Sequence, residues 1–561
     1  MRVLLIEAGG SSKDVTESRI PSAFLQLFRT RRDYNLYTEP QKHAGNKKKY
    51  WPRAKLLGGC SAMNAMMAQY GAPSDFDEWA EIVGDKSWSW TNFSKHVVHP
   101  PWSLPSVDLC CFRYFRKFEK YNPDPRFPHV DPLLRGANGP VEIGYSAHIW
   151  PGCADFVQAS MNVGIPFSPD FCTTKGTQGT NKFLNNQYIV TYIDNKSTRV
   201  TAESAYLTDD VLARPNLTVV TYARVTKVLF DTSGVEFASK SDTGRSRTQE
   251  VVVCGGAIYS PHILMLSGIG PAVQLSRHNI PVVLDAPGVG ANLLDHPAVP
   301  LRLKEKTGKS FNYLTPYNMR TTCMFMRDLL RYQLWGTGPI ASNIGEAVAF
   351  FRSDNSVLFP PTEYKHDIED ANSGTDAPDI ELIMCTAAVR AHTELLGKTL
   401  EAYQILIVLL RPTSKGSLFL KSADPWDNPL MDPSYLETKH DVDVLVRGIR
   451  AAFKIAHTEP MSTSVTDVHS THPELDHHFS HLSDAELADV VRDRVETLYH
   501  PIGTCAMGPG GVVDSNLHVH GTQGLRVCDA SIFPKLVSGH PTGAIIATAE
   551  KLADVIKAQY A

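Results

Sequence analysis

The stretch that decides the fold is YHPIGTCAMG at residues 499–508, which is followed by a second His-Pro pair in GHPTG at residues 539–543. In both motifs a proline follows the histidine, His500 or His540, and a glycine follows two residues later. Proline fixes φ and glycine permits tight turns, so both imidazoles are expected to project from rigid corners. An imidazole so placed can accept or donate a proton near neutral pH. A lone His-Pro pair more often caps a turn, but the acid Asp529 lies between these two motifs and a helix-patterned run follows the second, which favours a shared site.

Length and composition exclude several classes of protein. With 561 residues, 43% hydrophobic and 20% charged, the chain has an ordinary globular balance and is long enough for two or more domains. Its formal net charge of −4 gives no basic footprint for nucleic acid, and no apolar run approaches the roughly 18 residues that a membrane helix needs. Ten cysteines without CxxC spacing predict neither a zinc site nor a disulfide framework. The opening residues, MRVLLIE, lack the layout of a signal peptide, so localisation is left open, with the cytoplasm expected if the start is genuine.

The first apolar run, VLLI at residues 3–6, ends at an acid, Glu7, and then at AGG. This pattern is typical of a buried parallel strand that stops at a turn. In dinucleotide-binding folds the second strand ends in such an acid, which hydrogen-bonds the ribose hydroxyls, so Glu7 is a candidate cofactor ligand. The first strand and its GxGxxG turn should lie roughly 20 residues upstream of that acid. We therefore expect an N-terminally incomplete chain; the alternative is a protein that has lost its ordinary hold on the cofactor.

A glycine-rich loop follows in WPRAKLLGGCSAMN at residues 51–64. Gly58 and Gly59 permit close approach of the backbone to a ligand, while Ser61 and Asn64 supply short polar groups. From the glycines alone, a structural loop is the better interpretation. The motifs that follow along the chain favour a cofactor-binding loop instead.

Two further motifs lie in GAIYSPHILMLSGIGP at residues 256–271 and GVGANLLDHP at residues 288–297. The first is typical of a strand, a turn and a helix that ends at glycine. In the second, Asp295 and His296 stand beside apolar neighbours, and a structural role is favoured over catalysis for both. Strand-like runs at 379–387, 403–411 and 416–420 predict an antiparallel sheet covered on one side by helices.

Two helical runs, 441–456 and 484–498, lead to the first His-Pro motif. Four aromatic residues in the preceding region are candidates for a pocket, although core packing is favoured for most of them. These are Trp335, Phe350, Phe351 and Phe359.

Together these motifs resemble the glucose-methanol-choline (GMC) family of flavin oxidoreductases, over nearly the whole chain from residue 3 to residue 557. The resemblance implies an α/β FAD-binding, Rossmann-like domain, N-terminally incomplete, and an α+β substrate domain with an antiparallel sheet. The expected FAD-binding domain covers about 1–300, with cap segments at about 80–190. The expected substrate domain covers 301–436, and residues 437–561 contribute to both domains, with the catalytic histidines and a C-terminal FAD-binding segment.

The resemblance also implies how FAD is held. Besides Glu7 and the glycine loop, it places the backbone of Val225 against the adenine, and Asp529 and Ala530 at the pyrophosphate and ribityl region. Pro541 and Thr542 begin a helix whose N-terminus points at the isoalloxazine and favours negative charge there. Where some members carry a histidine that bonds covalently to the flavin, this chain has Met63, so non-covalent FAD is expected.

The resulting hypothesis is an alcohol oxidase or dehydrogenase, most similar to the aryl-alcohol oxidase and choline dehydrogenase branches. His500 removes the hydroxyl proton of a primary or secondary alcohol, hydride passes to flavin N5, and His540 holds the oxygen in line. The electron acceptor is oxygen or a quinone-type compound, and secondary metabolism is one possible setting. Two alternatives remain at this stage: a non-redox lyase that contains FAD, and a cofactor-free inactive paralogue.

Two segments do not fit a regular reading of the chain. VVHPPWSLPSVDLCC at residues 97–111 interrupts a helical pattern with three prolines and predicts a surface insertion or a gene-model error. The histidines at 469, 472, 477, 478 and 481 suggest a metal site, but the spacing gives no defensible ligand geometry and a solvated linker is expected.

Overall fold

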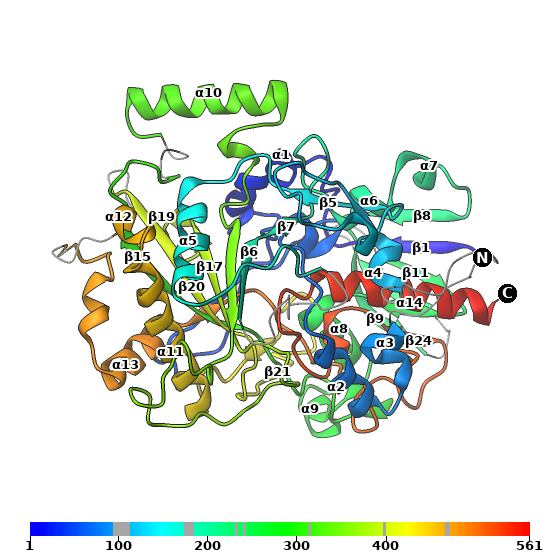
Figure 1. Ribbon diagram of the computed structural model, residues 1–561. Helices are drawn as coiled ribbons and strands as arrows, with labels where there is room; N and C mark the ends of the chain where they lie inside the picture. The colour runs from blue at the N-terminus through cyan, green and yellow to red at the C-terminus, as the bar shows by residue number, and fades with distance from the viewer. Residues whose placement is uncertain are drawn as a thin grey trace, which may run out of the picture.

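Figure 1 shows the computed structural model, which describes residues 1–93, 113–172, 184–230, 234–238, 243–311, 313, 316–396, 400–465, 470 and 472–560. The predicted insertion at 97–111 and His469 lie outside the described residues. The chain forms two regions. A β-sheet with its helices lies on the left of the view, and a second region lies on the right, where both termini are found.

The left-hand region is built on six strands in the order β23-β15-β20-β17-β16-β6, and every neighbouring pair is antiparallel. The antiparallel sheet expected from the sequence is therefore confirmed, although it also takes strands from outside residues 301–436. Its strands are β6 (Leu184–Tyr188), β15 (Pro297–Lys304), β16 (Ala347–Phe351), β17 (Ile380–Cys385), β20 (Ala402–Leu409) and β23 (Glu496–Thr497).

One face of this sheet is covered by helices and the other lines a cavity. Helices α5 (Pro151–Asn162) and α11 (Lys439–Ala456) contact the sheet and each other. At Gly448 of α11 a Cβ would lie 2.3 Å from Ile407, so only glycine permits this close packing. Because side chains alternate along a strand, the neighbours of Ile407 on β20, Leu406 and Gln404 among them, turn to the opposite face and line the cavity.

Parallel strand pairs of the right-hand region include two beside the cavity. β1 (Val3–Ile6) pairs with β8 (Leu217–Val220), and β12 (Val251–Val253) pairs with β24 (Leu525–Val527). The predicted N-terminal parallel strand is thus present, but the burial expected for it is wrong, since none of its four residues is buried. Val3 and Leu4 are 47% and 38% exposed, and β1 and β12 both line the same cavity.

Two helices of this region begin at the cavity. α8 (Gly256–Leu266) starts after β12, and α14 (Thr542–Gln559) starts directly after His540. α14 packs against α4 (Arg113–Phe118) and runs toward the terminus marked C in Figure 1.

The shorter elements cover and connect these regions. The helices are α1 (Thr16–Arg19), η1 (Pro21–Leu27), η2 (Gly59–Ala62), α2 (Pro73–Val83), η3 (Lys86–Trp88), α3 (Trp90–Phe93), η4 (Pro132–Leu134), α6 (Ala202–Tyr206), α7 (Asp209–Leu212), α9 (Ala272–Arg277), α10 (Met319–Trp335), η7 (Pro339–Ala341), α12 (Met461–Val465), η8 (His477–His481), α13 (Asp484–Arg494) and η9 (Ala530–Ile532). The strands are β2 (Leu36–Tyr37), β3 (Tyr50–Trp51), β4 (Glu119–Tyr121), β5 (Val141–Tyr145), β7 (Val190–Thr191), β9 (Arg224–Leu229), β10 (Gly234–Ala238), β11 (Thr243–Arg247), β13 (Ile269–Gly270), β14 (Leu284–Asp285), β18 (Val389–Arg390), β19 (Glu394–Leu395), β21 (Ser417–Phe419) and β22 (Leu430–Asp432).

Two details of the sequence-based prediction are wrong, and the expectation that most of the four candidate aromatics are core holds for three of them. The run at 416–420 forms β21, which pairs with β22 in a separate two-stranded sheet. The run at 484–498 is helical only to Arg494, because the next residues join the large sheet as β23. Trp335 is 68% exposed at the end of α10, whereas the other three candidate aromatics are buried. None of the helices described is long and apolar enough to cross a membrane.

Candidate active site

A cavity of about 1610 Å³ lies between the large sheet and strands β1 and β12. Every site residue proposed from the sequence lines it. These are Glu7, Gly58, Gly59, Ser61, Asn64, Val225, His500, Asp529, Ala530, His540, Pro541 and Thr542. Segments that lie hundreds of residues apart in the chain therefore meet around one space.

His500 sits on a corner that its neighbours hold rigidly. Tyr499 has φ +70°, and Gly503 has φ +88° at a point where a Cβ would lie 2.3 Å from the carbonyl oxygen of Asn292. The backbone N–H of His500 donates to Asp295 Oδ1 at 2.8 Å. The other carboxylate oxygen of Asp295 accepts from Thr497 Oγ1 at 2.5 Å. Asp295 thus fixes the corner, as the structural role expected for it implies.

His296 contacts the ring of His500 directly. The two Nδ1 atoms are 2.9 Å apart, so one ring donates and the other accepts. Burial, together with the charge of the nearby His540, lowers the pKa of His296 to about 3. Burial first, and then His540, lowers the pKa of His500 well below its usual range. Both rings are therefore neutral at physiological pH.

His540 is held by a different partner. Its Nε2 lies 3.1 Å from Glu381 Oε1 on the cavity side of β17, and its backbone N–H donates to Gln69 Oε1 at 3.1 Å. Glu381 is fully buried, and its Oε2 has no hydrogen-bond partner among the described residues. The carboxylate thus fixes the His540 ring by charge as well as by geometry.

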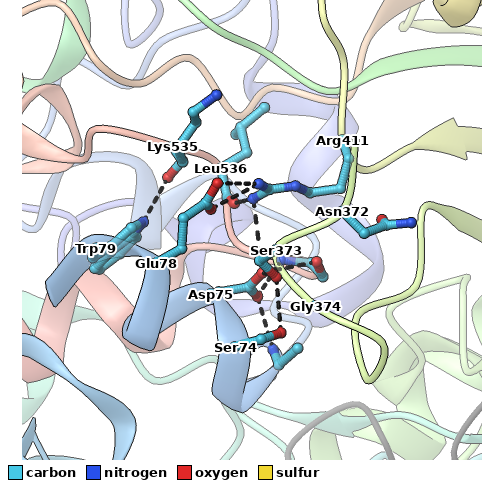
Figure 2. Close-up of polar contacts among 12 residues, drawn as sticks. Ser74, Asp75, Glu78, Trp79, Asn372, Ser373, Gly374, Arg411, Lys535 and Leu536 are labelled. Atoms are coloured by element: carbon cyan, nitrogen blue, oxygen red, sulfur yellow. Dashed lines mark hydrogen bonds and ion pairs between the residues drawn. The ribbon is translucent and has the colours of Figure 1, made fainter. Parts of the chain in front are cut away.

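A buried polar cluster anchors the segment before His540 (Figure 2). Asp75 Oδ2 accepts the backbone N–H groups of Ala72 at 2.8 Å and Ser538 at 2.6 Å, and Oδ1 accepts from Ser373 Oγ at 2.7 Å. Arg411 beside it forms a bidentate pair with Glu78 at 2.7 and 2.9 Å. Helix α2, the 373 loop and the segment that carries His540 are therefore tied together at one point.

The two imidazoles are close enough to act on one substrate atom. The ring centroids of His500 and His540 are 4.8 Å apart, with the planes at 80°. Two positive charges at this distance repel strongly, and only His540 has a carboxylate beside it. The two rings are therefore not both protonated, and the lowered pKa of His500 leaves that ring as a base.

The cavity fits an anionic dinucleotide. Gly59 has φ +56° and a Cβ there would meet nothing within 4 Å, so the backbone is open to a ligand. Arg53 and Arg224 line the same cavity, and each has a buried guanidinium nitrogen without a hydrogen-bond partner among the described residues. α14 begins at the cavity with no side-chain cap at Pro541, which leaves its N-terminal N–H groups and partial positive charge available to a ligand.

Several proposed ligands are already held by protein groups. Ser61 Oγ donates to the Gly58 carbonyl at 2.6 Å and accepts the Ala202 N–H at 2.8 Å. Asp529 accepts the N–H groups of Gly256 at 2.9 Å and Ser531 at 2.8 Å, so its carboxylate caps α8 and η9. These two residues shape the cavity wall as much as they offer contacts to a ligand.

Glu7 and Asn64 remain better placed for direct contact. Glu7 Oε1 accepts the Gly9 N–H at 2.6 Å, and burial raises the pKa of its carboxyl to about 7. Asn64 Oδ1 accepts from Arg199 Nη1 at 2.8 Å, which leaves the amide N–H groups as donors.

Sequence reasoning missed three functional contacts. Glu381 lies in an otherwise apolar strand, IELIMC at 380–385. A single carboxylate among buried apolar residues was the signal that could have indicated a functional role. Asp75 carried no such signal, because an acid near the start of a helix is ordinary. The contact of His296 with His500 was not visible either, since the two residues are distant in sequence.

Comparison with known proteins agrees with this geometry. The family model described as GMC oxidoreductase matches residues 3–298 in its N-terminal part and 412–549 in its C-terminal part. The chain belongs to the GMC oxidoreductase family. The resemblance inferred from the motifs is thereby confirmed.

Relatives of this GMC oxidoreductase cover its full length. "Dehydrogenase str4" of Strobilurus tenacellus is 36% identical, over 99% of this chain and 90% of its own length. "Alcohol dehydrogenase [acceptor]" of Pseudomonas putida is 30% identical, over 99% and 91%. Among solved structures, a formate oxidase variant from Aspergillus oryzae RIB40 has a TM-score of 0.84 at 26% identity, over 100% of this chain and 94% of the other. The family fold thus extends through both regions of the chain.

Among the residues that the structure describes, no group of three or more His, Cys, Asp or Glu side chains could hold a metal ion. Of the histidine cluster, His477 is buried and its Nε2 accepts the backbone N–H of Lys304 at 2.9 Å.

Proposed function

We propose that this GMC oxidoreductase oxidises a primary or secondary alcohol to an aldehyde or ketone with FAD as its cofactor. The observation that carries the proposal is the 2.9 Å contact between the Nδ1 atoms of His500 and His296. If Nδ1 of His500 carries the proton and donates it to His296, Nε2 is left unprotonated. A neutral, half-buried imidazole with a free Nε2 in the cavity is a suitable general base.

In the proposed mechanism, Nε2 of His500 accepts the hydroxyl proton of the alcohol. His540, oriented by Glu381, hydrogen-bonds the same oxygen and stabilises the negative charge that develops there. The carbinol carbon loses a hydride as its bond to oxygen becomes a double bond. FAD, when bound, supplies the hydride acceptor at N5 of the isoalloxazine.

The chain's own residues indicate how FAD would be held. Glu7 and Val225 would contact the adenosine half, and the loop from Gly58 to Asn64 would follow the middle of the cofactor. Pro541 and Thr542 would present the N-terminus of α14 to the isoalloxazine. We further propose non-covalent attachment, because Met63 offers no imidazole nitrogen for a bond to the flavin and is itself 3% exposed.

The substrate side of the cavity is mostly apolar. Ile383, Cys385 and Leu406 line it from the sheet, and polar residues are interspersed among them. These are Asn343, His392, Gln404, Glu496 and Thr497. This lining suits an alcohol with an apolar or aromatic body better than a charged one. The choice between oxygen and a quinone as acceptor and a setting in secondary metabolism both stay predictions.

The decisive experiment is anaerobic mixing of the FAD-loaded protein with benzyl-type and aliphatic primary alcohols, followed by flavin absorbance. We expect the oxidised bands to bleach with at least one alcohol. His500→Ala should slow flavin reduction by about a hundredfold or more. His478→Ala, which removes an exposed histidine, should not change it.

Two outcomes would contradict the proposal. Flavin that stays oxidised while an alcohol is cleaved would indicate a lyase. An unchanged reduction rate in His500→Ala would remove that residue from the role of base.

A further inference from the structure

Helix α10 stands apart from the body of the protein at the top of Figure 1. It covers Met319–Trp335 and is capped at both ends, by the Asn318 side chain accepting the Thr321 N–H and by Gly336 in the left-handed conformation. Such caps stabilise a helix independently of tertiary packing. Its exposure is therefore not a consequence of fraying.

The outward face of α10 is apolar. The residues opposite the packed face recur at the three- and four-residue spacing of one helical stripe. These are Met319, Cys323, Met326, Leu330 and Leu334, of which the methionines and leucines are 54–78% exposed. Trp335, 68% exposed, follows at the end of the helix.

The packed face of the same helix is mixed, because Met324 and Phe325 pack against the core beside two polar contacts. Asp328 is 1% exposed and accepts a hydrogen bond from Tyr313 at 2.7 Å, and Tyr332 donates to the Ser197 carbonyl at 3.0 Å. A surface helix in water normally has polar side chains on the side turned away from the core, whereas α10 has a second apolar stripe there. The outer stripe of α10 thus requires a covering partner.

The charges of α10 favour an anionic partner. Its arginines, Arg320, Arg327 and Arg331, and its one acid, Asp328, give +2 in a chain of net charge −4. Arg327 pairs with Asp328 at 2.8 Å, while neither of the other two arginines is paired with a carboxylate among the described residues. On a helical projection all three arginines flank one side of the apolar stripe.

A second copy of the chain fits this surface poorly. A helix of 17 residues is roughly 25 Å long, so its stripe offers far less than the roughly 800 Å² per partner of a stable interface. A membrane has no such minimum area. Apolar side chains flanked by arginine, with tryptophan at one end, are the features of helices that lie in the interface of a bilayer.

We propose that α10 docks this enzyme on a membrane surface that contains anionic phospholipid, lying in the interface without crossing it. Met319, Met326, Leu330, Leu334 and Trp335 enter the boundary between headgroups and acyl chains, and the arginines remain at the headgroups. α10 also contacts η7, and residues 343–345, just beyond η7, line the cavity. The docked helix therefore places one wall of the cavity close to the membrane.

The test is co-sedimentation of the FAD-loaded protein with phosphatidylcholine vesicles, with and without phosphatidylserine. We expect binding to the anionic vesicles that weakens with salt. Met326→Ser, Leu330→Ser and Leu334→Ser combined should weaken binding by at least about a hundredfold, since each large apolar side chain contributes roughly tenfold. Arg320→Gln and Arg331→Gln should each weaken it about fivefold.

The matched control is Leu133→Ser with Val273→Ser, which removes two side chains that are 72% and 68% exposed elsewhere on the surface. This control should bind like the wild type, and circular dichroism should show all variants folded. Absence of wild-type binding to either vesicle, or equal loss in the control, would overturn the proposal. A wild-type dimer in light scattering that the triple variant dissolves, without vesicle binding, would assign the stripe to a second copy instead.

Discussion

Replacement of His296 tests whether it sets the proton position on His500. In His296→Leu the Nδ1–H of His500, as the proposed mechanism places it, loses its acceptor 2.9 Å away, the ring of the fully buried His296. An unsatisfied buried donor costs about 1–3 kcal/mol, and the ring can relieve this cost by moving its proton to Nε2, the atom needed as base. At 1.36 kcal/mol for each factor of ten, flavin reduction should slow by about 5- to 150-fold.

The matched variant is His296→Asn, whose side-chain oxygen can occupy the position of Nδ1 and accept the same hydrogen bond. It should recover most of the rate. The assay is anaerobic stopped-flow reduction of the FAD-loaded enzyme over a range of alcohol concentrations, which separates the reduction rate from substrate affinity. Affinity should change little in either variant. Equal impairment of the Leu and Asn variants, or a Leu variant within about twofold of wild type, would refute the reasoning.

Three further predictions concern the buried charges around the site. Glu381→Gln removes the carboxylate beside His540. Flavin reduction should slow about tenfold or more, because the ring that hydrogen-bonds the developing alkoxide loses the carboxylate that orients it; unchanged reduction would exclude this role. Asp75→Asn weakens the hydrogen bonds that anchor the segment before His540. Denaturant titration should therefore show a free energy of unfolding that is lower by about 2–4 kcal/mol, and a loss below about 0.5 kcal/mol would contradict this anchoring role. Burial lowers the pKa of His262 to about 4, so the unfolded chain binds more protons than the folded chain below about pH 6.5. The free energy of unfolding should therefore be at its full value above that pH and fall by roughly 3 kcal/mol toward pH 4. In denaturant titrations over this pH range, His262→Gln should reduce that loss.

Prediction from the sequence succeeded where the relevant information was local. The strand before Glu7, the glycine loop around Gly59 and the helix after His540 all form as expected, because each depends on periodicity, turn residues or short-range steric limits. The twelve proposed site residues line one cavity. The sequence could indicate them together because they belong to long motifs of the family. Their individual roles in binding and catalysis remain predictions.

The limits of prediction appear at single residues. Core packing was favoured for most of four aromatic residues, and the sequence did not tell that Trp335 is the exception at the end of an exposed helix. The pattern of α10 is that of any amphipathic helix, and nothing local tells which side faces the body. The end of α13 at Arg494 was likewise missed, since pairing of β23 with β15 competes with the local helical preference.

The sequence by itself determined the family, the candidate cofactor loops and the two histidines at their proline corners, because these depend on residue types at fixed short spacings. Only the tertiary structure decided which partner each histidine has. Alternation along β17 turns Glu381 toward His540, and the 288–297 segment brings His296 to His500. These contacts join strands and turns far apart in the chain, and their proximity follows from sheet register and packing, which no local pattern encodes.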